Sequence, residues 1–304
     1  MNPLASIWSN QPIVFVSGKG GVGKSLIAAS VASQLAKSGR KVLLAELGDN
    51  SYYKDLWNID VVGHSPVSVP GQTFDLALWS GETCLREYVL HYLRLERLYR
   101  LFFENKVMRA LVNVAPGLNE IAVLGKITSG LRKVGPPLRY DVIVIDAYAT
   151  GHAKALLQAP RGIMEAIKFG PMGHQSQEMD QLMRDPAVVK YLVVTLLEEM
   201  PVTETIEFVK SLKSDLNIEA SVIANRKLIS PVSESDLQAV KGADHSGLGE
   251  FAKYLCGVIA RQKKMSRLLE ENGLNVLEVP QVFSTHPDVL VEKVGEVLKL
   301  KSMT

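Results

Sequence analysis

The feature that most constrains the fold is a glycine-rich octapeptide near the N-terminus, from Gly18 to Ser25. It fits the phosphate-binding pattern G-x-x-x-x-G-K-S/T at every defined position. A β-branched and aromatic run precedes it at 12–17, and apolar residues recur at helical spacing after it at 25–38. The octapeptide therefore lies between a strand and a helix, and it predicts binding of a nucleoside triphosphate.

Each residue type in this loop has a chemical task. The glycines let backbone N–H groups converge on one anion, and the helix N-terminus adds partial positive charge. Lys24 is expected to contact the terminal phosphates, and the Ser25 hydroxyl can ligate Mg²⁺. The predicted nucleotide-contacting residues of the loop are Gly18, Lys19, Gly20, Gly21, Val22, Gly23, Lys24, Ser25 and Leu26.

Composition narrows the setting. The 304 residues, 47% of them hydrophobic, can bury the core of one large α/β domain. Lys plus Arg total 34 against 32 Asp plus Glu, so no basic excess points to nucleic acid, and none is expected as a partner. Cys84 and Cys256 are far apart and form no C-x-x-C pair, which argues against disulfides, zinc and iron–sulfur clusters. We expect a cytoplasmic protein without signal peptide or membrane span, with peripheral attachment to the inner face of a membrane as an alternative.

Apolar runs and amphipathic segments alternate along the chain, which predicts class α/β with a mostly parallel sheet flanked by helices. Together with the octapeptide, this pattern predicts a P-loop NTPase fold. Strands are expected at 41–47, 74–79, 142–145, 191–197, 219–225 and 275–280. Helices are expected at 118–133, 203–212, 251–272 and 288–300.

Segment 82–114 is helical in pattern and apolar on more than one face. It is therefore either sandwiched within the fold or exposes a hydrophobic surface to a partner. We expect a single domain over 1–304, with an α-helical subdomain formed by about 82–134 and 161–188.

The second informative stretch is YDVIVIDAYAT, from Tyr140 to Thr150. Its apolar run is typical of a central parallel strand, which would deliver Asp146 to the carboxyl edge of the sheet, where ligands bind. A carboxylate there suits Mg²⁺, directly or through water, and capping of the next helix is the structural alternative. Thr150-Gly151-His152 predicts a small hinge, the expected form of a second switch.

Together these motifs resemble the ArsA family of anion-transporting ATPases, which includes the arsenite-pump ATPase and the ATPases that target tail-anchored proteins. Asp146 to His152 resembles the family pattern D-x-x-x-T-G-H, and Leu156 to Pro160 resembles L-L-x-x-P. Other similar segments are Pro116 to Glu120, Val194 to Glu199, Thr203 to Thr205, and Val222 to Asn225. The resemblance spans most of the chain, from residue 13 to about 290.

The resemblance implies a Mg-ATP-driven homodimer with facing nucleotide sites and a helical part that opens and closes as ATP and ADP exchange. Lys19 resembles the signature lysine of the deviant loop GKGGVGKS/T, which reaches the partner's nucleotide; a solvated lysine on the loop rim is the alternative. Asn225 and Pro280 resemble residues beside the base, and an amide offers that base a donor and an acceptor. Asn225 would equally serve as a cap for the turn at 226–227.

The chain departs from the family at the first switch. Gly48 stands where the family has the aspartate thought to position the attacking water. Asp49, the next residue, is our preferred replacement, and Glu46 at the end of the strand is the alternative. The position of the carboxylate, rather than its intrinsic pKa, decides which of them can orient the water. The predicted catalytic residues are thus Lys19, Lys24, Asp49 and Asp146, and the predicted Mg²⁺ ligands are Ser25 and Asp146.

Residues 161–185 stand at the family's client-groove lid and contain four methionines, Met164, Met172, Met179 and Met183. Methionine suits either varied hydrophobic partners or ordinary core packing. The family's arsenite-binding cysteines and its C-x-x-C zinc thiolates have no counterparts here.

Three functions follow. The favoured one is a dimeric ATPase switch that binds a protein client, a membrane-protein partner or another hydrophobic client. The second is a weakly hydrolysing or inactive regulatory subunit that forms a heterodimer with a paralogue. The third is a positioning switch on membranes or nucleoids resembling MinD and ParA, although the C-terminus lacks a long basic amphipathic helix.

Overall fold

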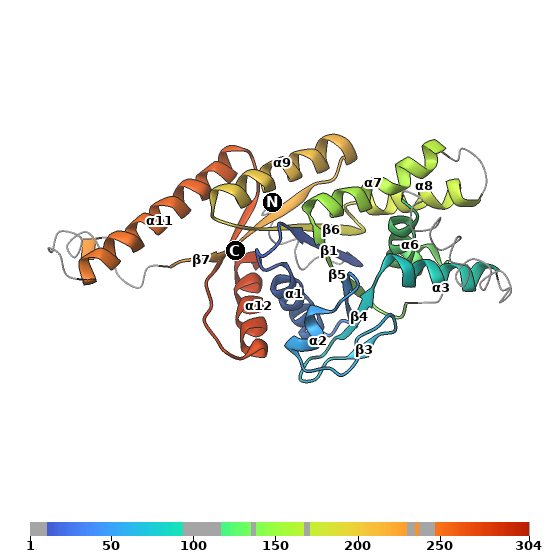
Figure 1. The fold of residues 1–304 in the computed structure, drawn as a ribbon, viewed down its shortest axis with the longest axis horizontal. Helices are drawn as coiled ribbons and strands as arrows, with labels where there is room; N and C mark the ends of the chain where they lie inside the picture. Colours follow the sequence, from blue (N-terminus) through green and yellow to red (C-terminus); the bar gives the residue numbers. More distant parts are fainter. Residues whose placement is uncertain are drawn as a thin grey trace.

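The computed structural model describes residues 11–93, 117–134, 138–166, 171–229, 235–236 and 247–303. Their strands form one eight-stranded sheet in the order β3-β4-β2-β5-β1-β6-β7-β8 (Figure 1). All neighbouring strands are parallel except β3 and β4 at one edge. The predicted α/β fold with a mostly parallel sheet is confirmed.

The strands are β1 (Ile13–Gly18), β2 (Val42–Leu47), β3 (Val67–Ser68), β4 (Asp75–Trp79), β5 (Val142–Ala149), β6 (Val189–Leu196), β7 (Ala220–Lys227) and β8 (Val276–Pro280). The helices are α1 (Lys24–Lys37), α2 (Tyr52–Leu56), α3 (Gly81–Leu93), α6 (Leu118–Arg132), α7 (Thr150–Ala166), α8 (Pro171–Arg184), α9 (Glu199–Leu216), α11 (Gly247–Glu271) and α12 (Pro287–Met303). None of these helices, within the described residues, combines the length and apolar content that a bilayer span requires.

The central strand β1 is buried on both faces. Ile13 and Phe15 belong to the core shared with α6, α7 and α9, whereas Val14 and Val16 belong to the core shared with α1 and α12. Alternate residues of a strand point to opposite faces, so a continuous apolar run is what such a position requires. The loop that follows β1 therefore starts from one of the most firmly packed places in the molecule.

Helices α3, α6, α7 and α8 gather at one end of the molecule, where α3 packs against α6 and α7 against α8 (Figure 1). The single domain over 1–304 and its helical subdomain at about 82–134 and 161–188 stay predictions. The part of the expected helical run at 94–114, and Pro116 of the family-like P-G-L-N-E segment, lie outside the described residues. Most of residues 230–249 lie outside them as well.

The junction between β5 and α7 differs from the sequence expectation. The strand continues to Ala149, and α7 begins at Thr150. Thr150, Gly151 and His152 therefore form the first turn of a helix rather than a separate hinge loop, because strand and helix meet directly. The short elements α2 and β3 were also not predicted from the sequence.

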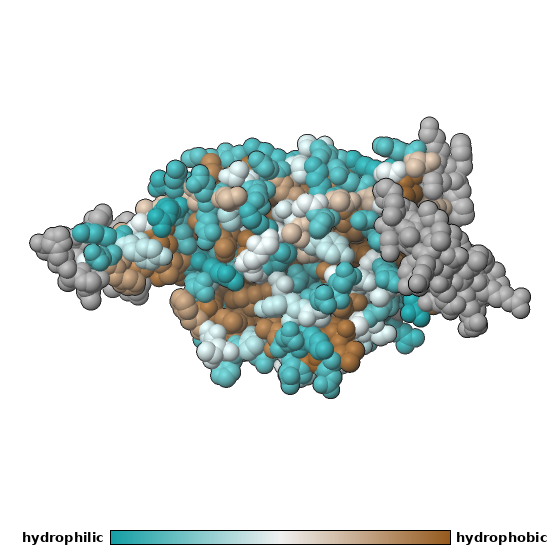
Figure 2. All heavy atoms as spheres, viewed as in Figure 1, coloured by the Kyte–Doolittle hydropathy of each residue, from teal (hydrophilic) through white to brown (hydrophobic). Residues whose placement is uncertain are grey.

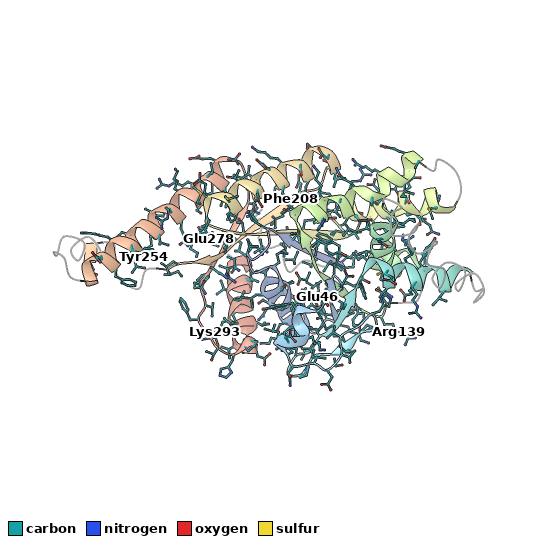
Figure 3. The ribbon with its side chains drawn as sticks, viewed as in Figure 1. Glu46, Arg139, Phe208, Tyr254, Glu278 and Lys293 are labelled. Carbon is teal, nitrogen blue, oxygen red and sulfur yellow. The ribbon has the colours of Figure 1, made fainter. Side chains whose placement is uncertain are left out.

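Helix α11 projects at the opposite end of the molecule, and Tyr254 lies on its outer half (Figure 3). On the face shown in Figure 2, hydrophobic residues gather mainly in the lower half, around α12 and α2, and hydrophilic residues cover the outer side of α9.

Candidate nucleotide site

Two glycines shape the loop between β1 and α1. Gly18 has a φ of 151°, and a Cβ there would lie 2.2 Å from the carbonyl oxygen of Val194 in β6. Gly23 has a φ of 94°, and a Cβ there would lie 2.4 Å from the amide nitrogen of Asn225. Neither position has room for a side chain. The loop can therefore lie directly against the carboxyl ends of β6 and β7.

Lys24 is the first residue of α1, and its side chain extends back to the loop that precedes the helix. Its Nζ donates a hydrogen bond to the carbonyl oxygen of Lys19 at 3.2 Å. Burial lowers the pKa of Lys24, and the nearby Asp146 carboxylate opposes that shift. The ammonium thus lies at the helix N-terminus, where a phosphate chain would be held.

Lys19 turns away from Lys24 and forms an ion pair with Glu204 of α9. The two side chains are 31% and 38% exposed. In the single chain, the predicted trans-acting lysine therefore has an intramolecular partner.

Asp146 lies within β5 and is 5% exposed. The Tyr53 hydroxyl lies 2.9 Å from its Oδ2 and 2.8 Å from the Ser25 carbonyl oxygen, and the Ser25 side chain also hydrogen-bonds Asp146. Burial raises the pKa of Asp146, while the bonds from Ser25 and Tyr53 and the charge of Lys24 oppose this. These contacts bring the two predicted metal ligands together.

The second carboxylate oxygen of Asp146, Oδ1, is buried and has no hydrogen-bond partner among the described residues. Buried polar atoms are rarely left unpaired, so this oxygen points to a group that binds there. A carboxylate oxygen beside a serine hydroxyl and a phosphate-binding loop suits Mg²⁺, which binds few protein oxygens and keeps several waters. The residues therefore fit the implied ion.

Glu46 is the alternative water-positioning residue, and both oxygens of its carboxylate accept hydrogen bonds from the segment that follows β2. It lies at the end of β2, near the middle of the molecule (Figure 3), and is 6% exposed. Its Oε1 accepts from the backbone N–H of Tyr52 at 2.7 Å, and its Oε2 accepts from the Ser51 hydroxyl at 2.5 Å. Glu46 thus holds the start of α2.

Asp49 has a more open position. It is exposed and lines a cavity of about 380 Å³ together with Glu120, Tyr148 and His152. Burial raises the pKa of Tyr148 to about 12, with further contributions from the Asp49, Cys84 and Glu120 charges. Of the two first-switch carboxylates, Asp49 is the one with room for water beside it.

Asn225, the predicted base-contacting residue, is 2% exposed. Its Nδ2 donates to the Val22 carbonyl oxygen at 2.9 Å, and its Oδ1 accepts from the Arg226 backbone N–H at 2.9 Å. These bonds support the capping alternative and also hold the phosphate-binding loop. Pro280 ends β8 directly beside Lys227 of β7, so both predicted base-side residues reach the same sheet edge, and contact with the base stays a prediction.

Three residues of this region were not predicted to belong to the site: Tyr53, Glu204 and Arg226. Arg226 has a left-handed φ of 56°, and its guanidinium lies 3.9 Å from where a Gly23 Cβ would be. Glu204 falls in a segment that resembles the family, which was the one available signal. Nothing in the local pattern of α2 distinguishes Tyr53.

The sequence of this chain is similar to a known protein family and to several curated proteins. The family described as "Anion-transporting ATPase" matches residues 11–170. "ATPase BagA" of Mycobacterium tuberculosis is 33% identical over 298 residues, covering 88% of this chain and 85% of that protein. A "Putative arsenical pump-driving ATPase" of Halobacterium salinarum is 30% identical, covering 71% of this chain and 35% of that protein. An "ATPase ASNA1 homolog" of Plasmodium chabaudi chabaudi is 29% identical, covering 51% of this chain and 38% of that protein. This chain therefore belongs to the anion-transporting ATPase family.

Proposed function

We propose that this ATP-hydrolysing enzyme is a Mg²⁺-dependent dimeric switch whose nucleotide state controls the binding of a protein or hydrophobic client. The ATPase activity follows from family membership. The observation that carries the magnesium site is the meeting of Lys24, Ser25 and Asp146 at one loop, with Asp146 Oδ1 left open.

Each residue then has a role. Backbone N–H groups of the loop and the Lys24 ammonium hold the phosphates. Ser25 and Asp146 hold Mg²⁺, the latter directly or through water, and the ion when bound neutralises charge on the phosphates. Asp49 orients the attacking water from the cavity wall, since Glu46 is engaged with α2.

The dimeric part of the proposal concerns Lys19. Its ion pair with Glu204 is more than 30% exposed on both sides, and such pairs contribute about 0–1 kcal/mol. Lys19 can therefore leave Glu204 at little cost and reach a nucleotide across an interface, where an ammonium stabilises the transferred phosphoryl group.

The client part rests on the helical end of the molecule. An apolar crevice of about 30 Å³ lies between α3, α6 and α8, lined by residues that include Leu85, Ile121 and Met172. Met179 and Met183 are 2% exposed and fill the core, the alternative expected for the methionines. An α-helix is about 10 Å wide, so a helical client would enter only after these helices separate.

Phosphate release tests the enzymatic core. With Mg-ATP, the purified chain should turn over, and Lys24→Ala should lose at least about a hundredfold in rate because the phosphates lose their ammonium. Lys37→Ala is the matched control, since Lys37 lies in the last turn of the same helix and pairs with Glu292 on the surface.

A regulatory subunit paired with a paralogue is the second candidate, because Gly48 replaces the family's aspartate. ATP binding without phosphate release by the purified chain would favour it. A cytoplasmic location, or peripheral attachment to a membrane, belongs to either proposal, and pelleting with liposomes with and without ATP distinguishes the two locations.

A further inference from the structure

We propose that Tyr53 is a positioning residue of the magnesium site: its hydroxyl fixes the Asp146 carboxylate for the metal and ties the first-switch helix α2 to that carboxylate. This inference rests on the proposed nucleotide site and adds a residue to it.

The geometry around the hydroxyl carries the argument. Tyr53 is fully buried, and its oxygen lies 2.8 Å from the Ser25 carbonyl oxygen and 2.9 Å from Asp146 Oδ2. A phenol is protonated at neutral pH and has one proton to donate, and the charged Asp146 Oδ2 is the stronger of its two acceptors. The hydroxyl therefore acts as a donor to the Asp146 carboxylate, beside Ser25.

A buried tyrosine needs one hydrogen-bond partner, and the Ser25 carbonyl alone would satisfy that need. The contact with a buried carboxylate does more. The two oxygens of Asp146 are held rigidly in one plane, so a donor at Oδ2 fixes the direction of Oδ1, the oxygen without a partner among the described residues. Bonds to a charged acceptor are also stronger than neutral ones.

Tyr53 also belongs to a packed aromatic row. Its ring stacks on Trp57 with centroids 5.2 Å apart and planes 12° from parallel. The Trp57 Nε1 donates to Asp288 Oδ1 of α12 at 2.9 Å. If Asp146 moves when the metal binds, the Tyr53 hydroxyl should move with it. The motion should then pass to α2 and to the Trp57 indole, which stacks on the Tyr53 ring.

The test compares Tyr53→Phe with the matched control Tyr52→Phe. Each variant loses one phenolic oxygen from α2, but Tyr52 is 54% exposed. Tyr52→Phe keeps both the backbone N–H that bonds Glu46 and the ring that packs edge-on against Tyr53, with centroids 5.5 Å apart. A fluorescent ATP analogue is held at fixed concentration while Mg²⁺ is titrated, and its affinity is measured separately in EDTA. Tyr53→Phe should need about tenfold more Mg²⁺ for half-maximal binding, as loss of one charge-assisted bond implies. Its affinity in EDTA should equal that of the wild type.

A second readout follows α2 itself. In protein labelled with 5-fluorotryptophan, the Trp57 resonance, assigned with Trp57→Phe, should shift when Mg²⁺ is added to the nucleotide complex. The shift should persist in Tyr52→Phe and be lost in Tyr53→Phe. If Tyr53→Phe does not fold, the ζ-carbon resonance of Tyr53 in wild-type protein takes its place, and it should respond to Mg²⁺ more than that of Tyr52.

The outcomes separate the two proposals. If the wild type does not bind the analogue at any Mg²⁺ concentration, the nucleotide site itself is wrong. If the wild type binds but Tyr53→Phe has the same Mg²⁺ dependence, or if Tyr53 ζ-carbon is unmoved by Mg²⁺, Tyr53 is a core residue only.

Discussion

At the scale of single residues, the site is organised by which partner each charged group has. Lys24 faces Asp146, Glu46 holds the start of α2, and Lys19 pairs with Glu204 of α9. The last pair joins the glycine-rich loop to α9, which packs on the opposite face of the sheet from α1. It therefore competes with any role of Lys19 at a second subunit.

Removing Glu204 tests that competition. Glu204→Gln should change the free energy of unfolding by less than about 1 kcal/mol, because the pair is partly exposed. It should also increase the dimer fraction formed with Mg²⁺ and a non-hydrolysable ATP analogue, measured by light scattering after gel filtration. Adding Lys19→Ala should abolish the increase. A smaller dimer fraction in Glu204→Gln would instead show that Glu204 acts with Lys19 in the dimer.

The two first-switch carboxylates should separate into a catalytic and a structural residue. Asp49→Asn should lower the hydrolysis rate by about a hundredfold, the scale of positioned acid–base groups, and leave the melting temperature nearly unchanged. Glu46→Gln should destabilise the protein by about 1–2 kcal/mol, because one of its two hydrogen bonds to α2 is lost. Phosphate release measures the hydrolysis rate of each variant, and chemical denaturation measures its stability. If Glu46→Gln lost hydrolysis and Asp49→Asn lost only stability, Glu46 would be the residue that positions the water.

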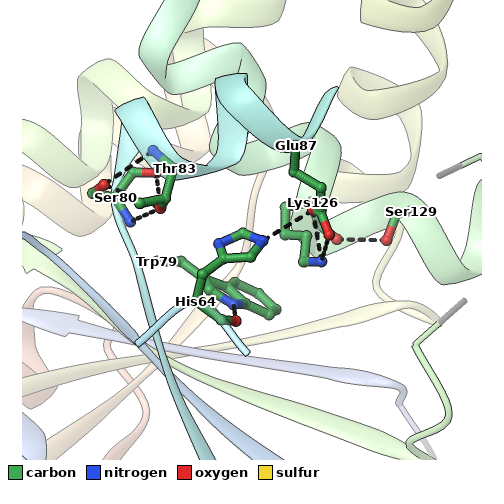
Figure 4. A network of polar contacts seen from close by, with 7 residues as sticks. All are labelled: His64, Trp79, Ser80, Thr83, Glu87, Lys126 and Ser129. Carbon is green, nitrogen blue, oxygen red and sulfur yellow. Dashed lines mark hydrogen bonds and ion pairs between the residues drawn. The ribbon is translucent and has the colours of Figure 1, made fainter. Parts of the chain in front are cut away.

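At the scale of elements, α3 and α6 are joined to the sheet edge by a polar cluster (Figure 4). Lys126 of α6 is 8% exposed and lies 2.7 Å from Glu87 of α3 and 5.7 Å from the ring centre of Trp79 in β4. His64 Nε2 lies 3.1 Å from the same carboxylate. Burial raises the pKa of Glu87, but bonds from His64 and Lys126 outweigh it and lower the pKa. The cluster fixes how the helical end is attached.

Breaking this cluster should loosen the helical end. Lys126→Met should lower the free energy of unfolding by about 2 kcal/mol, because Glu87 keeps its burial and loses its main cation. Lys154→Met is the control, since the Lys154–Asp215 pair is at least 32% exposed on both sides and should contribute under about 1 kcal/mol. In a double-mutant cycle by urea denaturation, Glu87→Gln should recover part of the loss. Purely additive effects would contradict a direct coupling.

At the scale of the whole molecule, one mostly parallel sheet connects the candidate nucleotide site to both ends. The loop, Asp49 and Asp146 lie at the carboxyl edge of β1, β2 and β5, and the cavity that Asp49 lines is also bounded by the start of α6 and α7. Hydrolysis or release of the nucleotide would therefore take place next to the helical end that we propose binds a client.

Nucleotide-driven dimerisation predicts a dependence on protein concentration. With Mg²⁺ and a non-hydrolysable ATP analogue, the melting temperature should rise as the protein concentration increases, because association stabilises the folded state by mass action. Without nucleotide, and in Lys24→Ala with nucleotide, it should stay constant. Differential scanning calorimetry over a hundredfold concentration range measures this. A nucleotide-bound melting temperature independent of concentration would contradict a nucleotide-driven homodimer.

The strands and the main helices could be predicted because their signals are local. Central strands such as β1 and β5 are buried on both faces and so read as continuous apolar runs. The glycine-rich loop and Asp146 also follow from local pattern, since a parallel strand must deliver its last residues to one edge of the sheet. The direct passage from Ala149 into α7 was missed, because Thr-Gly-His is compatible with either a loop or a helix start.

The sequence by itself determined the family, the sheet and the glycine-rich loop between β1 and α1, because each of these is encoded by neighbouring residues. The tertiary structure alone decided the partners of the charged groups: Tyr53 meets Asp146 across 93 positions, Lys19 meets Glu204 across 185, and Asn225 meets Val22 across 203. Such contacts depend on the order in which distant strands assemble, and on the packing that brings their ends within hydrogen-bond distance, neither of which a local pattern contains.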